Sequence, residues 1–286
     1  MSETFVDLGF VTAPSGVVVL GLAGWTDYWR ELREPLSVRA AAAAKAGGGH
    51  LREGECEAVA VPAAADRPLA VRATTEPSVF DEEPTVATLE IELGLPWPEG
   101  VDGPVLLGDL PVDRSGMVVG DAVGLDAWTG LEDEPADGLA DLSYWGRYED
   151  DAHARFGGER IPQHGGVQGP YGWLDLPVAE AVALEAELST WRGGLPRKGV
   201  AVMVEKHVDY LRFRRAGVHH PLKAGVIEVG GCRVLGIDWC QGDHSLRHHG
   251  GRDWGQAFAV TLEADGAGGT VLRWTIPPHD QDVEEA

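Results

Sequence analysis

Three side chains in the C-terminal part of the chain have the types and spacing of a metal site. Cys240, His244 and His248 follow one another at intervals of four residues, so on a helix they would share one face. Thiolate and imidazole are ligands that zinc prefers, and zinc is therefore the expected cofactor. The same stretch also fits a short capped turn, begun by Asp243 and ended by Gly250. Because the stretch has no paired Cys-x-x-Cys, both interpretations stay open.

Basic and imidazole side chains gather around these residues. The segment 192–254 contains eleven lysines and arginines against six acidic residues, a net charge of +5, whereas the rest of the chain carries −28. It also contains six of the ten histidines. Such a segment suits the binding of a carboxylate or phosphate group. The alternative is that its charges pair with the acidic remainder of the protein.

Five residues are candidates for contact with an anionic small molecule. Four belong to the basic segment, and the fifth lies in the glycine-rich segment 163–173, which could cover a ligand or form a tight loop packed by aromatic side chains. The chain has no Gly-x-Ser-x-Gly nucleophile motif, and the glycine-rich segment lacks the Lys-Ser/Thr of a phosphate loop. The sequence therefore names no reaction. The candidates are His219, His220, Arg212, Arg214 and His164.

The net charge of −23 indicates which classes of partner to expect. A chain this acidic repels nucleic acid and anionic lipid, so neither is an expected partner. A basic protein would be attracted, although the charge also suits solubility alone. Two hypotheses follow. The first is a non-catalytic binding or interaction protein of immunity-like type. The second is an enzyme that acts on an anionic small molecule through a His/Arg-rich, zinc-containing site.

The cysteines and the apolar stretches indicate a cytoplasmic protein. An odd number of cysteines without regular spacing (Cys56, Cys232 and Cys240) is not a disulfide framework. The first ten residues have no early lysine or arginine, so they do not form a secretory signal. The longest clearly apolar stretch, 17–24, is too short to span a membrane.

Short apolar runs separated by glycines predict many strands joined by tight turns. The segment 86–93 alternates apolar and polar residues, as a strand with one buried face does. Three hairpins are expected: 5–12 with 17–22, the two halves of 225–237 around Gly230-Gly231, and 256–263 with 270–276. Helices are expected at 177–190, 138–155 and 37–46. The predicted fold class is a β-rich α+β protein of antiparallel hairpins with a few helices.

One internal repeat is present. The segment from Ser15-Gly16 to Trp29 recurs from Ser115-Gly116 to Trp128 with a one-residue gap. It predicts a repeated unit of a hairpin followed by a short helix, which arose by duplication or by convergent turn chemistry. The expected organisation is therefore an N-terminal β-rich unit, 1–100, and a larger α+β unit, 101–286, divided at the Pro/Gly-rich segment 96–100.

Overall fold

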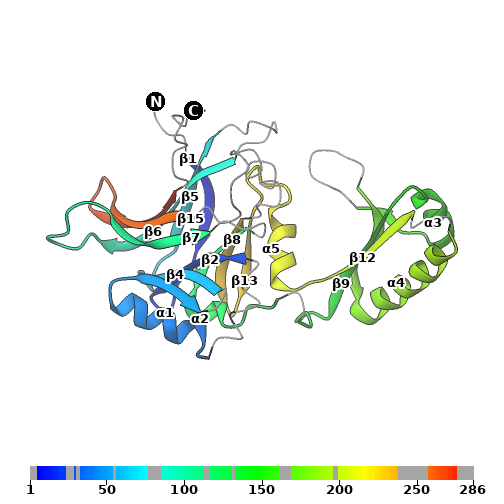
Figure 1. The fold of residues 1–286 in the computed structure, drawn as a ribbon, viewed down its shortest axis with the longest axis horizontal. Coiled ribbons are helices and arrows are strands. Elements are labelled where there is room, and N and C mark those ends of the chain that lie inside the picture. The colour runs from blue at the N-terminus through cyan, green and yellow to red at the C-terminus, as the bar shows by residue number, and fades with distance from the viewer. Residues whose placement is uncertain are drawn as a thin grey trace, which may run out of the picture. The chain divides into compact units, whose positions relative to one another are not determined.

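The computed structural model confirms a β-rich α+β protein, with three antiparallel sheets and five helices in its described part (Figure 1). The chain forms two compact units, Met1–Trp128 with His220–Ala286, and Thr129–His219. No helix in the described part is long and apolar enough to cross a membrane. The described residues are 5–23, 29, 33–53, 56–76, 85–111, 116–130, 133–161, 169–195, 199–237 and 257–275.

The first unit contains two six-stranded sheets. One sheet has, in spatial order, β1 (Phe5–Val11), β5 (Leu69–Glu76), β6 (Thr85–Pro96), β16 (Gly269–Thr275), β15 (Ala257–Ala264) and β7 (Val105–Pro111). The other has β13 (Ala224–Val229), β14 (Cys232–Ile237), β8 (Met117–Asp121), β2 (Val17–Leu22), β4 (Cys56–Pro62) and β3 (Gly49–Glu53).

The two sheets share one hydrophobic core, so they form a sandwich. Leu89 and Ile91 of β6 and Val18 and Leu20 of β2 belong to the same buried cluster. The strand β2 is buried along its whole length, because its second face is covered by α1 (Leu36–Lys45) and α2 (Ala122–Leu125). The buried residues of α1 are Leu36 and Ala40.

The two sheets have the same arrangement when followed from either edge. In chain order, β1 to β6 correspond to β7, β8 and β13 to β16, and each strand occupies the position that mirrors its counterpart. The repeat seen in the sequence lies at the centre of one sheet, where Leu20 of β2 faces Val119 of β8. Val19 faces Gly120 and Gly21 faces Val118 in the same antiparallel ladder. The pairing is therefore symmetric about a local two-fold axis, while duplication as its origin stays a prediction.

The edge strands repeat this correspondence in detail. In β1 an extra residue, Leu8, precedes Gly9 (φ 103°), and in β7 an extra residue, Leu107, precedes Gly108 (φ 148°). Both positions are β-bulges in which glycine tolerates the positive φ. The two edges of the sheet thus bend at equivalent places.

The expected strands 5–12 and 17–22 are present, but the prediction that they pair as a hairpin is wrong. β1 pairs with β5 in one sheet, whereas β2 pairs with β4 and β8 in the other. The turn at Pro14-Ser15-Gly16 therefore carries the chain from one sheet to the other. Ser15 is held by the carboxylate of Asp121, which accepts bonds from its amide at 2.8 Å and its hydroxyl at 2.6 Å.

The other expected hairpins and two of the three helices are confirmed. β6 covers 86–93, β13 pairs with β14 across Gly230-Gly231, and β15 pairs with β16. The helices at 37–46 and 177–190 are α1 and α4 (Val178–Gly193). The helix expected at 138–155 is wrong in its first half. That half is the strand β9 (Leu139–Gly146), and only α3 (Glu149–Phe156) is helical.

The unit Thr129–His219 is built on a four-stranded sheet. Its order is β10 (Glu159–Arg160), β11 (Tyr171–Pro177), β9 and β12 (Val200–Lys206). One face packs against α3 and α4, where Leu142, Tyr144, Ala181 and Leu188 form the buried core. The helix α5 (Asp209–Gly217) follows β12 after two residues. The boundary expected at 96–100 lies between β6 and β7, and the two compact units divide elsewhere.

Candidate functional site

The imidazole of His207 is fixed at the point where β12 ends and α5 has not yet begun. The backbone amide of His207 donates to the carbonyl of Leu139, 3.0 Å away, which prolongs the pairing of β12 with β9. Its side chain is only 10% exposed. The ring therefore cannot turn freely, and its two nitrogens face different carboxylates.

Two aspartates reach the same place from neighbouring strands. Asp141 lies on β9, and Asp175 lies on β11 within a bulge where the register shifts between Trp173 and Leu176. Asp175 has a φ of 57°, a left-handed conformation that costs energy in a residue other than glycine and that aspartate tolerates better than most. The amide of Asp175 donates to Asp141 Oδ1 at 2.9 Å. The bulge thus brings the second carboxylate towards the first.

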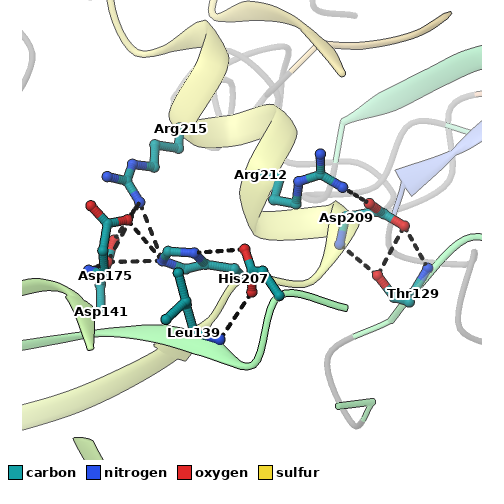
Figure 2. A network of polar contacts seen from close by, with 9 residues as sticks. Thr129, Leu139, Asp141, Asp175, His207, Asp209, Arg212 and Arg215 are labelled. Atoms are coloured by element: carbon teal, nitrogen blue, oxygen red, sulfur yellow. Dashed lines mark hydrogen bonds and ion pairs between the residues drawn. The ribbon is translucent and has the colours of Figure 1, made fainter. Parts of the chain in front are cut away.

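Figure 2 shows Asp141 and Asp175 together on one side of the His207 ring. Its Nε2 lies 2.9 Å from Asp141 Oδ1 and 3.8 Å from Asp175 Oδ1, while Nδ1 lies 3.3 Å from Asp137 Oδ2. One ligand atom from each of Asp141, Asp175 and His207 lies within 4.8 Å of the other two. These three residues are named here the Asp-Asp-His cluster.

One nitrogen and two carboxylate oxygens are a suitable donor set for a divalent transition metal. The arrangement also has the outer contact that metal-binding histidines commonly show, because Asp137 can accept a bond from Nδ1–H. That bond leaves Nε2 with its lone pair towards Asp141 and Asp175. Asp175 is 59% exposed, so the cluster is open to solvent on that side.

A basic side chain already lies against the cluster. Arg215 Nη1, from the last turn of α5, is 3.2 Å from Asp175 Oδ1, 3.3 Å from Asp141 Oδ2 and 3.2 Å from His207 Nε2. A neutral imidazole nitrogen either donates or accepts, so Nε2 cannot donate to Asp141 and accept from Arg215 at once. The polar contacts of Nε2 therefore compete with one another.

A further carboxylate, that of Glu205, lies near the cluster. Glu205 faces Asp141 directly across the β12–β9 pair. Burial is the largest cause that raises the pKa of Glu205. The negative charge of Asp141 raises it further, and Arg214 acts in the opposite direction. Carboxylates crowded in this way favour a bound cation.

A second polar contact closes the unit near its ends. Asp209 Oδ2 accepts bonds from the amide and hydroxyl of Thr129, both at 2.9 Å, and the Asp209 amide donates back to the Thr129 hydroxyl at 2.8 Å. Arg212 donates to Asp209 Oδ1 at 2.7 Å (Figure 2). These bonds fix Thr129, at the start of the unit, to the first residue of α5.

Four of the binding residues that the sequence suggested lie in the described part of the chain, and their role in binding stays a prediction. Arg212 contributes to the contact at Asp209, and Arg214 lies with its guanidinium 5.8 Å from the ring centre of Tyr210. His219 is exposed after the end of α5, and His220 accepts a bond from the amide of Leu222 at 3.1 Å. The candidates His164, Cys240, His244 and His248 lie outside the described residues. The zinc site expected at the last three therefore stays a prediction.

Sequence reasoning counted His207 and Arg215 within the basic segment but did not single them out, and it missed Asp137, Asp141 and Asp175. The cluster is assembled from three segments, because Asp175 lies 34 positions after Asp141 in the sequence and His207 lies 66 positions after Asp141. No spacing rule connects such positions. One usable signal was a histidine separated by two residues from the short apolar run 200–204.

Comparison of the chain with protein-family models, with curated proteins and with solved structures gave no match. The site is therefore interpreted from its own geometry.

Proposed function

We propose that this protein binds one divalent metal ion through His207, Asp141 and Asp175. The observation that carries the proposal is the convergence of an imidazole nitrogen and two carboxylates within 4.8 Å, with a further carboxylate on the other nitrogen of the ring. Zinc is the ion we propose, because it accepts mixed nitrogen and oxygen ligands at about 2.0–2.2 Å. Manganese and ferrous iron suit the same donors and serve as comparison ions.

Metal titration of the purified protein tests this proposal. We expect isothermal titration with Zn²⁺ to show one equivalent bound, and His207→Ala to weaken binding by 100-fold or more because a direct ligand is lost. Asp137→Asn should weaken binding by about 10–100-fold, the usual effect of removing the outer partner of a ligating histidine. His219→Ala, which removes an exposed histidine from the same unit, should leave the affinity unchanged.

The same titration distinguishes the two candidate metal sites. The double variant Cys240→Ser/His244→Ala removes two of the ligands that the sequence suggested. It leaves the Asp-Asp-His cluster intact, so we expect it still to bind one equivalent of Zn²⁺. If this variant lost the metal while His207→Ala retained it, the Asp-Asp-His cluster would be excluded as the metal site.

The geometry of the site supports a catalytic use of that metal, in an enzyme that acts on an anionic small molecule. Three protein ligands leave coordination positions for water or substrate, and Arg215 supplies a positive charge beside them. The expected activity is metal-assisted hydrolysis of a carboxylate or phosphate derivative. Hydrolysis of a panel of phosphate and carboxylate esters should require Zn²⁺ and be lost in Asp141→Ala.

A binding role with a basic protein partner is the second proposal, and the net charge of −23 supports it. Attraction between a strongly acidic protein and a basic partner weakens as salt screens the charges. Association with a basic model protein such as cytochrome c should therefore weaken markedly between 20 mM and 300 mM salt, concentrations that span Debye lengths of roughly 20 to 6 Å. An affinity that does not change with salt would remove this second proposal.

A further inference from the structure

Arg215 places a single guanidinium nitrogen against all three residues of the Asp-Asp-His cluster. Nη1 is 3.2 Å from Asp175 Oδ1, 3.3 Å from Asp141 Oδ2 and 3.2 Å from His207 Nε2. The positive group therefore occupies the position in which three prospective metal ligands converge, as Figure 2 shows.

An ion and this nitrogen cannot occupy the cluster together. A zinc ion bound to the three ligand atoms would lie about 2.0–2.2 Å from each of them. Because Nη1 lies 3.2–3.3 Å from atoms of the same three side chains, an ion bound to them would lie too close to this nitrogen. Two positive charges at that separation also repel each other strongly.

We infer that the cluster is an exchange site. In the metal-free protein the guanidinium of Arg215 occupies the cluster, and a divalent ion displaces it on binding. The inference rests on the proposed metal binding and adds how that binding is regulated. Arg215 neutralises part of the carboxylate charge in the metal-free protein, which would otherwise be unfavourable at two adjacent aspartates. The bound ion takes over that neutralisation.

The position of Arg215 permits the movement. Its side chain is 46% exposed and projects from the last turn of α5, so it can turn into solvent without moving the helix. The released guanidinium would remain beside the metal and be available to a carboxylate or phosphate. Anion binding at this place is therefore expected only in the metal-loaded protein.

Chemical modification of arginine tests the exchange. Phenylglyoxal reacts with accessible guanidinium groups, and peptide mass mapping follows each arginine separately. Saturating Zn²⁺ should raise the rate of modification at Arg215 several-fold and leave Arg155 unchanged, since Arg155 lies on α3 over the ring of Phe156. In His207→Ala, Zn²⁺ should have no effect on Arg215. The variant Arg215→Met should bind Zn²⁺ about tenfold more tightly than wild type, whereas Arg155→Met should not.

Each outcome decides one of the two proposals. If wild type binds Zn²⁺ and the reactivity of Arg215 does not change, the exchange is wrong and the metal site stands. If only Arg215→Met binds Zn²⁺, Arg215 excludes the ion from the wild-type protein. The conclusion that the ion and Arg215 cannot occupy the cluster together then stands, and the proposal that the native chain binds metal is wrong. If neither protein binds Zn²⁺, both proposals are wrong.

Discussion

The carboxylate of Asp121 is fully buried, yet each of its oxygens has two hydrogen-bond donors. Oδ2 accepts from the amide and hydroxyl of Ser15, and Oδ1 accepts from the amides of Val123 and Gly124, both at 2.9 Å. The residue thus caps α2 and fixes the turn that carries the chain between the two sheets. A buried charge is tolerated when its hydrogen bonds are satisfied in this way.

Replacement of Asp121 should destabilise the first unit strongly. Asp121→Ala removes a helix cap and leaves buried donors unpaired, and we expect a loss of about 3–5 kcal/mol in the free energy of unfolding. Urea denaturation followed by circular dichroism measures it. Asp66→Ala, at an exposed loop position, should change stability by less than about 0.5 kcal/mol. Equal effects of the two variants would contradict the structural role of Asp121.

Tyr144 predicts a dependence of stability on alkaline pH. Burial raises the pKa of its hydroxyl to about 12, and the hydroxyl donates to the carbonyl of Gly157. In the unfolded chain the pKa returns to about 10. The folded state therefore keeps a proton that the unfolded state loses, so this contribution is complete below pH 10 and is lost as the pH rises towards 12.

The variant Tyr144→Phe isolates this contribution. Urea midpoints measured at pH 9, 10.5 and 11.5 should fall less steeply in Tyr144→Phe than in wild type. Parallel decreases in the two proteins would show that ionisation of Tyr144 does not contribute.

At the scale of single elements, the β13–β14 hairpin depends on two glycines that differ in surroundings. Gly230 has a φ of 56° and Gly231 of 77°, the left-handed values of the tight turn that the sequence predicted. A Cβ at Gly231 would meet nothing within 4 Å, whereas one at Gly230 would approach the carbonyl oxygen of Gly124 to 2.8 Å. Only Gly230 therefore has a steric requirement beyond its backbone conformation.

Alanine substitutions at these positions should separate the two effects. Gly231→Ala should cost about 1–2 kcal/mol, the penalty of a left-handed conformation. Gly230→Ala should cost about 1–3 kcal/mol more, because a packed neighbour must also move. Thermal unfolding measures both, with Gly266→Ala as a control without contacts within 4 Å. A larger loss in Gly231→Ala would contradict the description of the turn.

Features that depend on neighbouring residues could be predicted from the sequence. The Gly230-Gly231 turn, the alternation of β6 and the helix α4 each have a local cause. That β1 and β2 belong to different sheets could not be predicted, since Pro14-Ser15-Gly16 permits a turn between sheets as well as within one. The helix expected at 138–155 failed because Leu142, Trp145, Tyr148 and Ala152 recur every three or four residues, although Leu142 and Trp145 lie on opposite faces of β9. The Asp-Asp-His cluster needs the pairing of three strands, which no local pattern specifies.

At the scale of the whole molecule, the two compact units have separate hydrophobic cores among the described residues. The sandwich core includes Leu20, whereas the core of Thr129–His219 includes Leu188. Units with their own cores can unfold in separate transitions.

Calorimetry should therefore resolve two transitions that respond to different variants. Leu188→Ala removes a fully buried side chain and should lower one transition by about 10 °C or more, while Leu20→Ala lowers the other. Addition of Zn²⁺ should raise only the transition that Leu188→Ala lowers, because the ion binds one unit. A single transition shifted by all three changes would show that the units unfold together.

The matching halves of the sandwich have one asymmetry with a practical consequence. The connection between β2 and β3 contains the helix α1, whereas the connection between α2 and β13 contains the whole unit Thr129–His219. The bonds between Thr129 and Asp209 hold the beginning of that unit to a residue near its end. The sandwich therefore has one insertion point, between α2 and β13, at which protein engineering could place a different folded unit.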